Sequence, residues 1–250
     1  MQLVLLTAFG VGGATIIGAL LGFAIKKISH AFSDIIMGFA AGVMLSAAVI
    51  GLVMPSLEYG TKPYGLIVTV AGIFCGAFCL NILDKLVPHL HGLVGIDGDG
   101  NAGQLDKILL FVVAIGIHNL PEGIAAGVSF GTENVADALL VAGGIALQNV
   151  PEGMVIIAPM LAVGVKPMRT FLIAAGTGLI EVVGTLLGFF AVNISVAILP
   201  FALAFAGGTM IYVVSDEMIP ETHAHGNERG ATYALLIGFC VMIGMDYLLG

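Results

Sequence analysis

A six-residue motif that occurs twice carries the side chains with the clearest chemical potential. Residues 118–123 read His-Asn-Leu-Pro-Glu-Gly, and residues 148–153 read Gln-Asn-Val-Pro-Glu-Gly. On a helix, residues four positions apart share one face. Each copy therefore places its first side chain, an imidazole or a carboxamide, beside its glutamate. We interpret each copy as half of a binding site.

The two motif glutamates lie near the centres of apolar segments, and so does a third glutamate. These residues are Glu122, Glu152 and Glu181. A charged side chain near the middle of a bilayer costs roughly 2.5–3.5 kcal/mol. No Lys or Arg lies in the middle of these segments to offset that cost. A positive charge from outside, either a proton or a metal cation, is therefore expected to neutralise them.

The spacing of the motif favours a metal cation. If the two helices run antiparallel, His118 lies near the depth of Glu152, and Gln148 lies near the depth of Glu122, an arrangement that suits one or two ions. Imidazole nitrogen with carboxylate and carboxamide oxygen suits Zn²⁺, Fe²⁺, Mn²⁺, Co²⁺ or Cd²⁺ better than Cu⁺ or Mg²⁺. The predicted metal ligands are His118, Asn119, Glu122, Gln148, Asn149, Glu152 and Glu181.

A second group of acidic residues and histidines falls near the ends of the predicted helices. Carboxylates and imidazoles there could take up an ion that leaves the central site. The candidate exit-side residues are Asp216, Glu217, His89, His91, His223 and His225. An ordinary solvated helix end or loop is the alternative interpretation for each of them.

The remainder of the sequence supplies the helices that must hold these residues. The chain has 250 residues, of which 59% are hydrophobic and only 10% are charged, and its mean hydropathy is +1.10. Soluble globular domains are about a quarter charged, and a membrane-spanning helix needs roughly 20 apolar residues. The sequence therefore predicts an all-α polytopic membrane protein with about eight transmembrane helices. The predicted spans are residues 2–25, 34–55, 64–83, 107–130, 135–163, 168–192, 195–219 and 231–249.

The connections between the spans are too short to form further domains. The longest, about residues 84–106, is too short and too Gly-rich to bury a core, so residues 1–250 are predicted to form a single transmembrane domain. A net charge of −8 without a basic cluster excludes nucleic acid as a partner. Cys75, Cys79 and Cys240 lie in apolar runs, which predicts small buried hydrophobic residues, not disulfide partners.

The basic residues indicate how the chain is oriented in the membrane. Seven of the eight Lys and Arg residues fall in odd-numbered connections, and only Lys62 falls in an even-numbered one. Lys and Arg near the ends of spans are retained on the cytoplasmic side. Both termini are therefore predicted to face the extracellular or periplasmic side, with the connection around 84–106 in the cytoplasm.

Two internal similarities predict inverted repeats. Residues 38–44 read Gly-Phe-Ala-Ala-Gly-Val-Met and resemble residues 204–210, Ala-Phe-Ala-Gly-Gly-Thr-Met, and each segment is followed about ten residues later by a proline. These segments, like the two copies of the polar motif, lie on predicted spans of opposite direction. Such pairs mark transporters whose binding sites lie near the membrane midplane. Chance similarity between Gly/Ala-rich helices is the alternative for the first pair.

The doubled motif in an eight-span chain resembles the ZIP (Zrt/Irt-like) family of divalent metal transporters, especially its bacterial GufA-like branch. The resemblance implies uptake of divalent metal into the cytoplasm across the cell (inner) membrane, with the metal as substrate and no cofactor. It also implies a binuclear centre formed by the seven predicted ligands, with Glu217 on the exit side. A homodimer and an elevator-like movement of one helix bundle against another are further implications. The chain departs from many relatives at Gln148, where they have His, and from some at Asn149, where they have an acidic residue.

Two other classes of protein need similar residues. An intramembrane metalloenzyme would use the same ligands to activate water, but the chain has no His-Glu-x-x-His segment and no evident separate nucleophile or base. A proton-coupled carrier of another substrate would need the buried carboxylates but not the histidine and the paired carboxamides. The sequence therefore favours a metal transporter over an enzyme.

Overall fold

The computed structural model describes residues 1–25, 29–59, 62–94, 102–132, 134–162 and 164–249, whose regular structure is helical. In chain order the helices are α1 (Gln2–Ala24), α2 (His30–Ser46), η1 (Ala47–Val53), α3 (Met54–Tyr59), α4 (Tyr64–Val94), α5 (Ala102–Ser129), α6 (Val135–Ala162), α7 (Pro167–Ile194), η2 (Val196–Ile198), α8 (Leu199–Val213), η3 (Val214–Met218), α9 (Ile219–Thr222) and α10 (Glu228–Leu249). The segments η1 and η3 are π-helical, and η2 is a short 3₁₀ helix.

The described helices form eight long rods, because η1 joins α2 to α3 and η3 joins α8 to α9 without a break. Each rod covers one predicted span. By length and hydropathy, seven of the rods could cross a bilayer, and α5, with 28 residues, is the remaining one. The predicted all-α polytopic architecture is confirmed. Helix also extends into the connection predicted around 84–106, since α4 continues to Val94 and α5 begins at Ala102.

Local sequence signals account for several helix ends. The side chain of Ser29 accepts a hydrogen bond of 3.2 Å from the backbone N–H of Phe32 and so caps the start of α2. Pro167 occupies the first turn of α7, where its missing N–H costs nothing. Gly164 has a φ of +85°, a conformation that glycine adopts without strain, in the short connection between α6 and α7.

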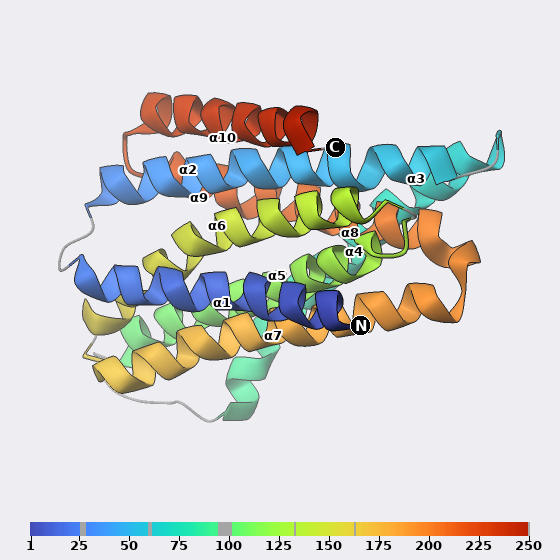
Figure 1. The fold of residues 1–250 in the computed structure, drawn as a ribbon. Helices are drawn as coiled ribbons and strands as arrows, with labels where there is room; N and C mark the ends of the chain where they lie inside the picture. The colour runs from blue at the N-terminus through green and yellow to red at the C-terminus, as the bar shows by residue number, and fades with distance from the viewer. Residues whose placement is uncertain (26–28, 60–61, 95–101, 133, 163, 250) are drawn as a thin grey trace.

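Both termini lie at one end of the molecule (Figure 1). The helix α1 starts there and α10 ends there, whereas α1 ends, and α2 and α10 begin, at the opposite end. The helix α5 also begins at that opposite end. This arrangement agrees with the predicted topology, in which odd-numbered connections share one side of the membrane.

The rods are arranged in two groups of four. The helices α1, α5, α6 and α7 pack against one another, and we call this group the motif bundle because it carries both polar motifs. The helices α2, α4, α8 and α10, with the short segments joined to them, form the second group, which we call the outer bundle. The two bundles meet mainly where α2 and η1 contact α6 and where α8 contacts α5.

Close helix crossings in the motif bundle repeat with inverted symmetry. A Cβ atom on Gly12 of α1 would meet the carbonyl oxygen of Gly178 in α7, and a Cβ atom on Gly178 would meet the carbonyl oxygen of Gly12. Likewise, Gly153 of α6 lies against the backbone of Thr15 in α1, while Gly123 of α5 lies against the backbone of Glu181 in α7. The pair α1 and α6 therefore corresponds to the pair α7 and α5.

The outer bundle has the same symmetry. Gly42 of α2 lies against the carbonyl oxygen of Leu235 in α10, and Gly208 of α8 lies against the carbonyl oxygen of Ile73 in α4. The positions 42 and 208 are equivalent in the segments 38–44 and 204–210, whose similarity predicted a repeat. The inverted repeat is therefore present in the packing of both bundles, and chance similarity of the sequences does not explain it.

The π-helical segments occupy equivalent places in the two repeats. The segment η1 ends just before Met54 and Pro55, and η3 ends just before Ile219 and Pro220. Proline has no N–H to donate to the preceding turn, so the helix must change its hydrogen-bonding pattern there. The consequence for η3 is that its widened turn presents acidic side chains beside the motif bundle.

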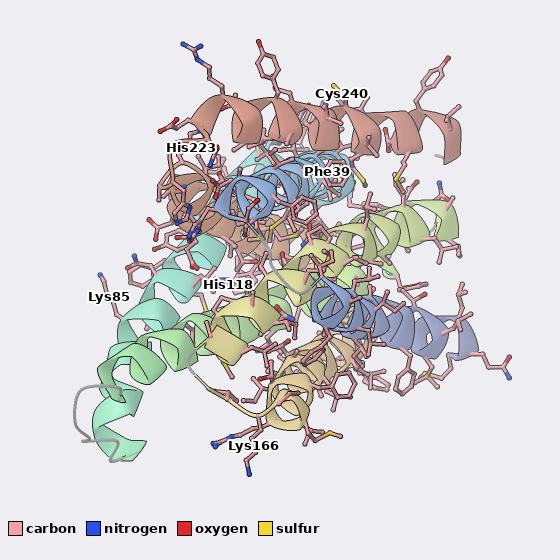
Figure 2. All side chains as sticks on the ribbon, turned by 90° about the vertical axis from the view of Figure 1, so that its left-hand side faces the viewer. Phe39, Lys85, His118, Lys166, His223 and Cys240 are labelled. Carbon is pink, nitrogen blue, oxygen red and sulfur yellow. The ribbon has the colours of Figure 1, made fainter. Side chains whose placement is uncertain are left out.

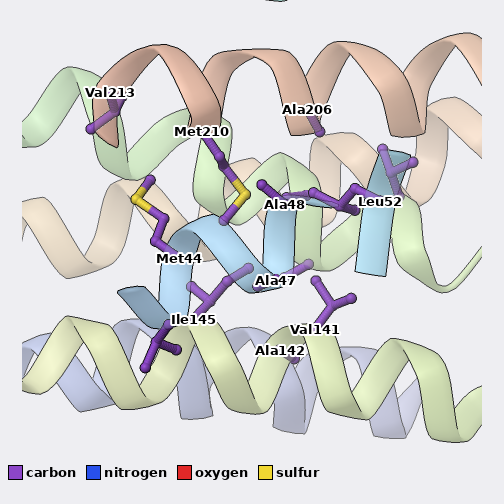
Figure 3. Packing of buried hydrophobic residues seen from close by; sticks show 14 of the residues in the cluster. Met44, Ala47, Ala48, Leu52, Val141, Ala142, Ile145, Ala206, Met210 and Val213 are labelled. Carbon is purple, nitrogen blue, oxygen red and sulfur yellow. The ribbon is translucent and has the colours of Figure 1, made fainter. Parts of the chain in front are cut away.

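An apolar core fills the contact between the bundles (Figure 3). Met44, Ala47 and Leu52 of the α2–η1 rod lie between α6 and α8. Their partners include Ile145 on α6 and Met210 on α8, and all five side chains are fully buried. Small alanines among them allow the two bundles to approach closely in this part of the interface.

The three cysteines are exposed, whereas the sequence predicts that they are buried. All are free thiols, as predicted, but Cys75, Cys79 and Cys240 lie on the outer surface of α4 and α10. On α4, Cys75 and Cys79 follow exposed apolar side chains, Phe74 and Phe78. In a membrane protein the outer surface is apolar because it faces lipid, so an apolar run does not distinguish a lipid-facing residue from a core residue.

Replacing Gly12 with alanine should destabilise the protein. The new methyl group would meet the backbone of Gly178, and overpacking of this kind costs about 1–3 kcal/mol in the free energy of unfolding. Thermal unfolding in detergent measures the effect. The matched control is Gly10→Ala on the same helix, where a Cβ atom meets no other atom within 4 Å. Equal unfolding temperatures for the two variants would show that the crossing of α1 and α7 is not constrained as described.

The orientation in the membrane stays a prediction, and cysteine labelling tests it. In a background with Cys75, Cys79 and Cys240 changed to alanine, Gln2→Cys should react with a membrane-impermeant maleimide on intact cells. Glu228→Cys, at the other end of the molecule, should react only after the membrane is opened. The reverse pattern would place both termini in the cytoplasm and reject the topology inferred from the basic residues.

Candidate metal centre

The predicted ligands lie together inside the motif bundle. All seven are buried. Six lie on the motif helices α5 and α6, three on each, and the seventh lies on α7. They are His118, Asn119, Glu122, Gln148, Asn149, Glu152 and Glu181. The close approaches at Gly123 and Gly153 bring α7 and α1 against the motif helices at this level. The sequence repeat and the inverted packing therefore converge on one polar centre.

The crosswise pairing expected for antiparallel motif helices is present. The Nε2 atom of Gln148 on α6 donates a hydrogen bond of 2.7 Å to Oε1 of Glu122 on α5. His118 on α5 and Glu152 on α6 line the same cavity. The glutamate of one motif is therefore hydrogen-bonded to the other copy, and the glutamate of the second motif shares a cavity with the histidine of the first.

The third glutamate has a different environment. One carboxylate oxygen of Glu181 accepts hydrogen bonds from Oγ1 of Thr15 at 2.8 Å and from Nδ2 of Asn119 at 2.5 Å. The other oxygen accepts a hydrogen bond of 2.6 Å from Nδ2 of Asn149. That amide nitrogen also lies 3.2 Å from the backbone carbonyl oxygen of Val11. Glu181 is thus held by donors from three other helices.

Several buried atoms of this centre that could bind a cation have no hydrogen-bond partner. In the described part of the chain, seven buried side-chain polar atoms lack one, and five of them belong to the predicted ligands. The five are His118 Nε2, Asn119 Oδ1, Glu122 Oε2, Gln148 Oε1 and Asn149 Oδ1. Buried polar atoms are normally satisfied, so such a concentration calls for a missing partner. A cation is a suitable partner, because four of the atoms are oxygens and the fifth is an imidazole nitrogen.

A cavity of about 490 Å³ leads to the centre from the side of the outer bundle. His118 and Glu152 form its wall on the motif bundle, and Asp216, Glu217 and Glu221 contribute carboxylates from η3 and α9. Figure 2, which views the molecule from the end opposite the termini, shows His118 between the two bundles. The predicted exit-side residues Asp216 and Glu217 therefore lie beside the centre.

The closest contact across the cavity joins the two bundles. Nε2 of His118 lies 2.6 Å from Oε1 of Glu217, although the atoms are not aligned as a hydrogen bond. Ile145, one turn before Gln148 on α6, and Met44 on α2 are fully buried in the apolar core. The centre therefore borders the cavity at His118 and Glu152 and the packed apolar core near Ile145.

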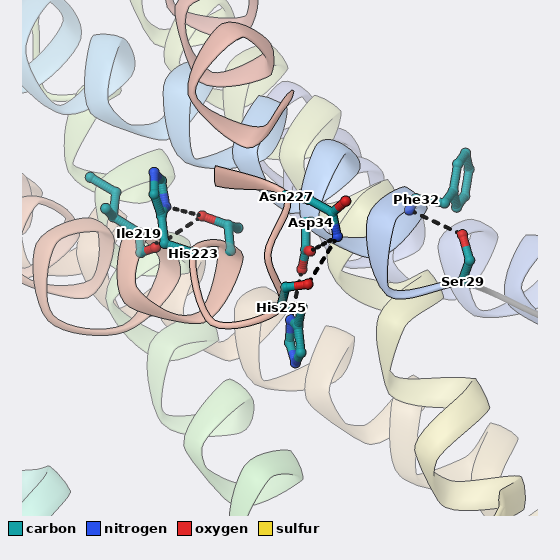
Figure 4. Close-up of polar contacts among 8 residues, drawn as sticks. Ser29, Phe32, Asp34, Ile219, His223, His225 and Asn227 are labelled. Carbon is teal, nitrogen blue, oxygen red and sulfur yellow. Dashed lines mark hydrogen bonds and ion pairs between the residues drawn. The ribbon is translucent and has the colours of Figure 1, made fainter. Parts of the chain in front are cut away.

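The predicted histidine pair at 223 and 225 is not arranged as a joint site. The ring of His223 contacts the carbonyl oxygen of Ile219 at 2.8 Å and Oγ1 of Thr232 at 3.1 Å. His225 instead pairs with Oδ1 of Asp34 at 2.9 Å (Figure 4). These contacts tie the start of α10 and the start of α2 together. The side chains of His89 and His91 lie outside the described part of the structure.

Among the described residues, no three His, Cys, Asp or Glu side chains form a group that could hold a metal ion by themselves. Sequence reasoning missed Thr15 and Asp34. The inverted repeat could have indicated Thr15, since it is the position in α1 equivalent to Glu181 in α7, but no sequence signal marks Asp34.

An inverted-repeat helical bundle with a buried polar centre beside a cavity is typical of membrane transporters. A family model described as ZIP Zinc transporter matches residues 97–246. The chain is 38% identical to zinc transporter GufA of Myxococcus xanthus over 96% of both chains, and 38% identical to zinc transporter ZIPB of Bordetella bronchiseptica over 95% of this chain and 78% of that protein. It is 31% identical to human zinc transporter ZIP11 over 98% of this chain and 97% of that protein.

The chain belongs to the ZIP family of zinc transporters. The resemblance inferred from the doubled motif is confirmed, including its GufA-like branch. The protein is accordingly a multi-pass membrane transporter of divalent metal ions, and metal ions are its transported substrates. Family membership favours this class over the metalloenzyme and over the carrier of another substrate.

Proposed function

We propose that this transporter carries Zn²⁺ into the cytoplasm through the centre between α5 and α6, and that Fe²⁺, Mn²⁺, Co²⁺ and Cd²⁺ are further substrates. The observation that carries the proposal is the group of four buried oxygens of the predicted ligands that have no hydrogen-bond partner, beside a cavity lined by His118 and Glu152. The zinc transporters GufA and ZIPB support the choice of metal. Carboxamide oxygen at Gln148, in place of the commoner imidazole, favours a broad range of borderline ions.

Charge supports a divalent ion in this position. Glu122 and Glu152 bring two carboxylates into a buried region of α5 and α6, and the Lys and Arg residues lie away from the middle of the spans. Burying carboxylates without a compensating charge is unfavourable. One divalent cation bound by both glutamates balances their charges and gives the unpartnered atoms a partner.

The cavity supplies a path for release. An ion held by His118 and Glu152 faces Glu217 directly, because His118 Nε2 and Glu217 Oε1 are only 2.6 Å apart. Asp216 and Glu221 continue the line of carboxylates along the cavity wall. With the predicted orientation this path leads to the cytoplasm. Uptake then requires a second state, in which the motif bundle slides along the apolar core and opens the centre toward the other side.

We also propose that the transporter works as a homodimer in the cell (inner) membrane. Phe74 and Phe78 leave more than half of their surface exposed on α4, which offers a second copy a rigid aromatic surface. Cys75 and Cys79 lie on the exposed part of the same helix. Copper-phenanthroline oxidation in native membranes should therefore produce a covalent dimer that disappears in the Cys75→Ala, Cys79→Ala double variant. A chain that stays monomeric in membranes would reject this arrangement.

Removing either motif glutamate should abolish transport while leaving the protein folded. Glu122→Gln and Glu152→Gln each remove one negative charge from the ion without changing the size of the side chain. Zinc flux into proteoliposomes should fall to the level of liposomes without protein. The exposed Glu228→Gln variant is the matched control and should transport like the wild type. Normal flux in either motif variant, at equal reconstituted amounts, would eliminate the centre as the transport site.

A further inference from the structure

Both carboxylate oxygens of Glu181 accept hydrogen bonds from buried side chains. Three side chains, Thr15, Asn119 and Asn149, donate to its two oxygens at 2.5–2.8 Å. A carboxylate in this state is stabilised by dipoles and does not depend on a cation for its burial. In contrast, Glu122 has one carboxylate oxygen without any partner. The two buried glutamates are therefore prepared for different roles.

The donors are turned so that they cannot bind a metal beside Glu181. Both asparagines present their NH₂ groups to the carboxylate, and an amide NH₂ group has no lone pair to offer a cation. The orientation of Asn149 is fixed independently, because its Nδ2 also contacts the carbonyl oxygen of Val11. Reversing this amide would place two oxygens against each other. A second metal ion next to Glu181 would thus lie against the N–H groups of both asparagines.

The oxygen atom of each asparagine amide has no hydrogen-bond partner. Asn119 Oδ1 and Asn149 Oδ1 are buried without a hydrogen-bond partner, as are Gln148 Oε1 and Glu122 Oε2. Because Glu181 holds the nitrogen of each asparagine, it determines where the oxygen of that amide lies. Glu181 therefore orients the two asparagine oxygens as ligands, while its own carboxylate stays hydrogen-bonded to the amide nitrogens and to Thr15.

We propose that Glu181 is a positioning residue, not a metal ligand, and that the centre holds one divalent ion. The carboxylate of Glu181, held in turn by Thr15, fixes the amides of Asn119 and Asn149 so that their oxygens serve the ion bound by the motif residues. This inference rests on the proposed function, and it revises the two-ion site implied by the family resemblance.

The inverted symmetry explains why Thr15 is the residue that donates a hydrogen bond to Glu181. Positions in α1 and α7 correspond with an offset of 166 residues, as between Gly12 and Gly178, and this offset pairs Thr15 with Glu181. The two equivalent side chains meet across the centre, where the hydroxyl donates and the carboxylate accepts. One repeat supplies the charge, and the other supplies a donor that holds it. The pair thus stabilises one negative charge without a second metal ion.

Zinc stoichiometry and affinity in the purified full-length protein test this proposal. Equilibrium dialysis should give one Zn²⁺ per wild-type chain, and zinc X-ray absorption should show no second metal at about 3.5–4 Å. Glu181→Gln should still bind one Zn²⁺ but about 10–100-fold more weakly, as is typical when a residue that orients metal ligands is changed. Thr15→Val should weaken binding several-fold, and Thr15→Ser should restore wild-type affinity.

The matched control is Thr177→Val. Thr177 is also buried, but its hydroxyl donates only to the carbonyl oxygen of Ala174 in its own helix, so zinc affinity should not change. Two ions in the wild type and one in Glu181→Gln would overturn the proposal, and so would unchanged affinity in Thr15→Val. If the wild type bound no zinc, or if Glu122→Gln bound zinc normally, the proposed function itself would fail.

Discussion

Burying three carboxylates in the middle of a membrane-spanning bundle is unfavourable in free energy, and the surrounding structure is arranged to offset this. The eight Lys and Arg residues lie toward the ends of the spans, so a protein cation does not neutralise these glutamates. Glu181 is stabilised by hydroxyl and amide donors. Glu122 and Glu152 are the carboxylates that we propose bind the divalent ion. The same unfavourable burial that would destabilise an empty centre therefore favours binding of the substrate.

The packing of the helices follows from the need to bring these residues together. Glycines at the crossings of α1 with α6 and of α5 with α7 let the backbones approach closely, so that short side chains such as Thr15 and Asn119 reach the carboxylate of Glu181. The inverted repeat produces both crossings from related segments. The outer bundle adds the apolar core on one side and the acidic η3 segment on the other, which gives the centre a closed side and an open side.

Much of this arrangement is predictable from the sequence, because the signals are local. Helical periodicity pairs His118 and Gln148 with their glutamates, and the cost of a charge in the bilayer identifies Glu122 and Glu152 as special. The orientation of the Asn149 amide is not predictable in this way, since it depends on a contact with Val11, which is 138 positions away in the sequence. For the same reason, the pairing of His225 with Asp34 required the tertiary structure. The surface position of the cysteines was missed because apolar runs occur both in the core and on the outer surface of a membrane protein.

Anomalous X-ray diffraction at the zinc absorption edge, from crystals of the full-length protein grown with Zn²⁺, tests the central claim most directly. The account predicts a zinc peak between α5 and α6, within about 2.0–2.2 Å of carboxylate oxygens from both Glu122 and Glu152. Absence of zinc from this position, together with a peak confined to the cavity mouth or to the loops, would contradict it.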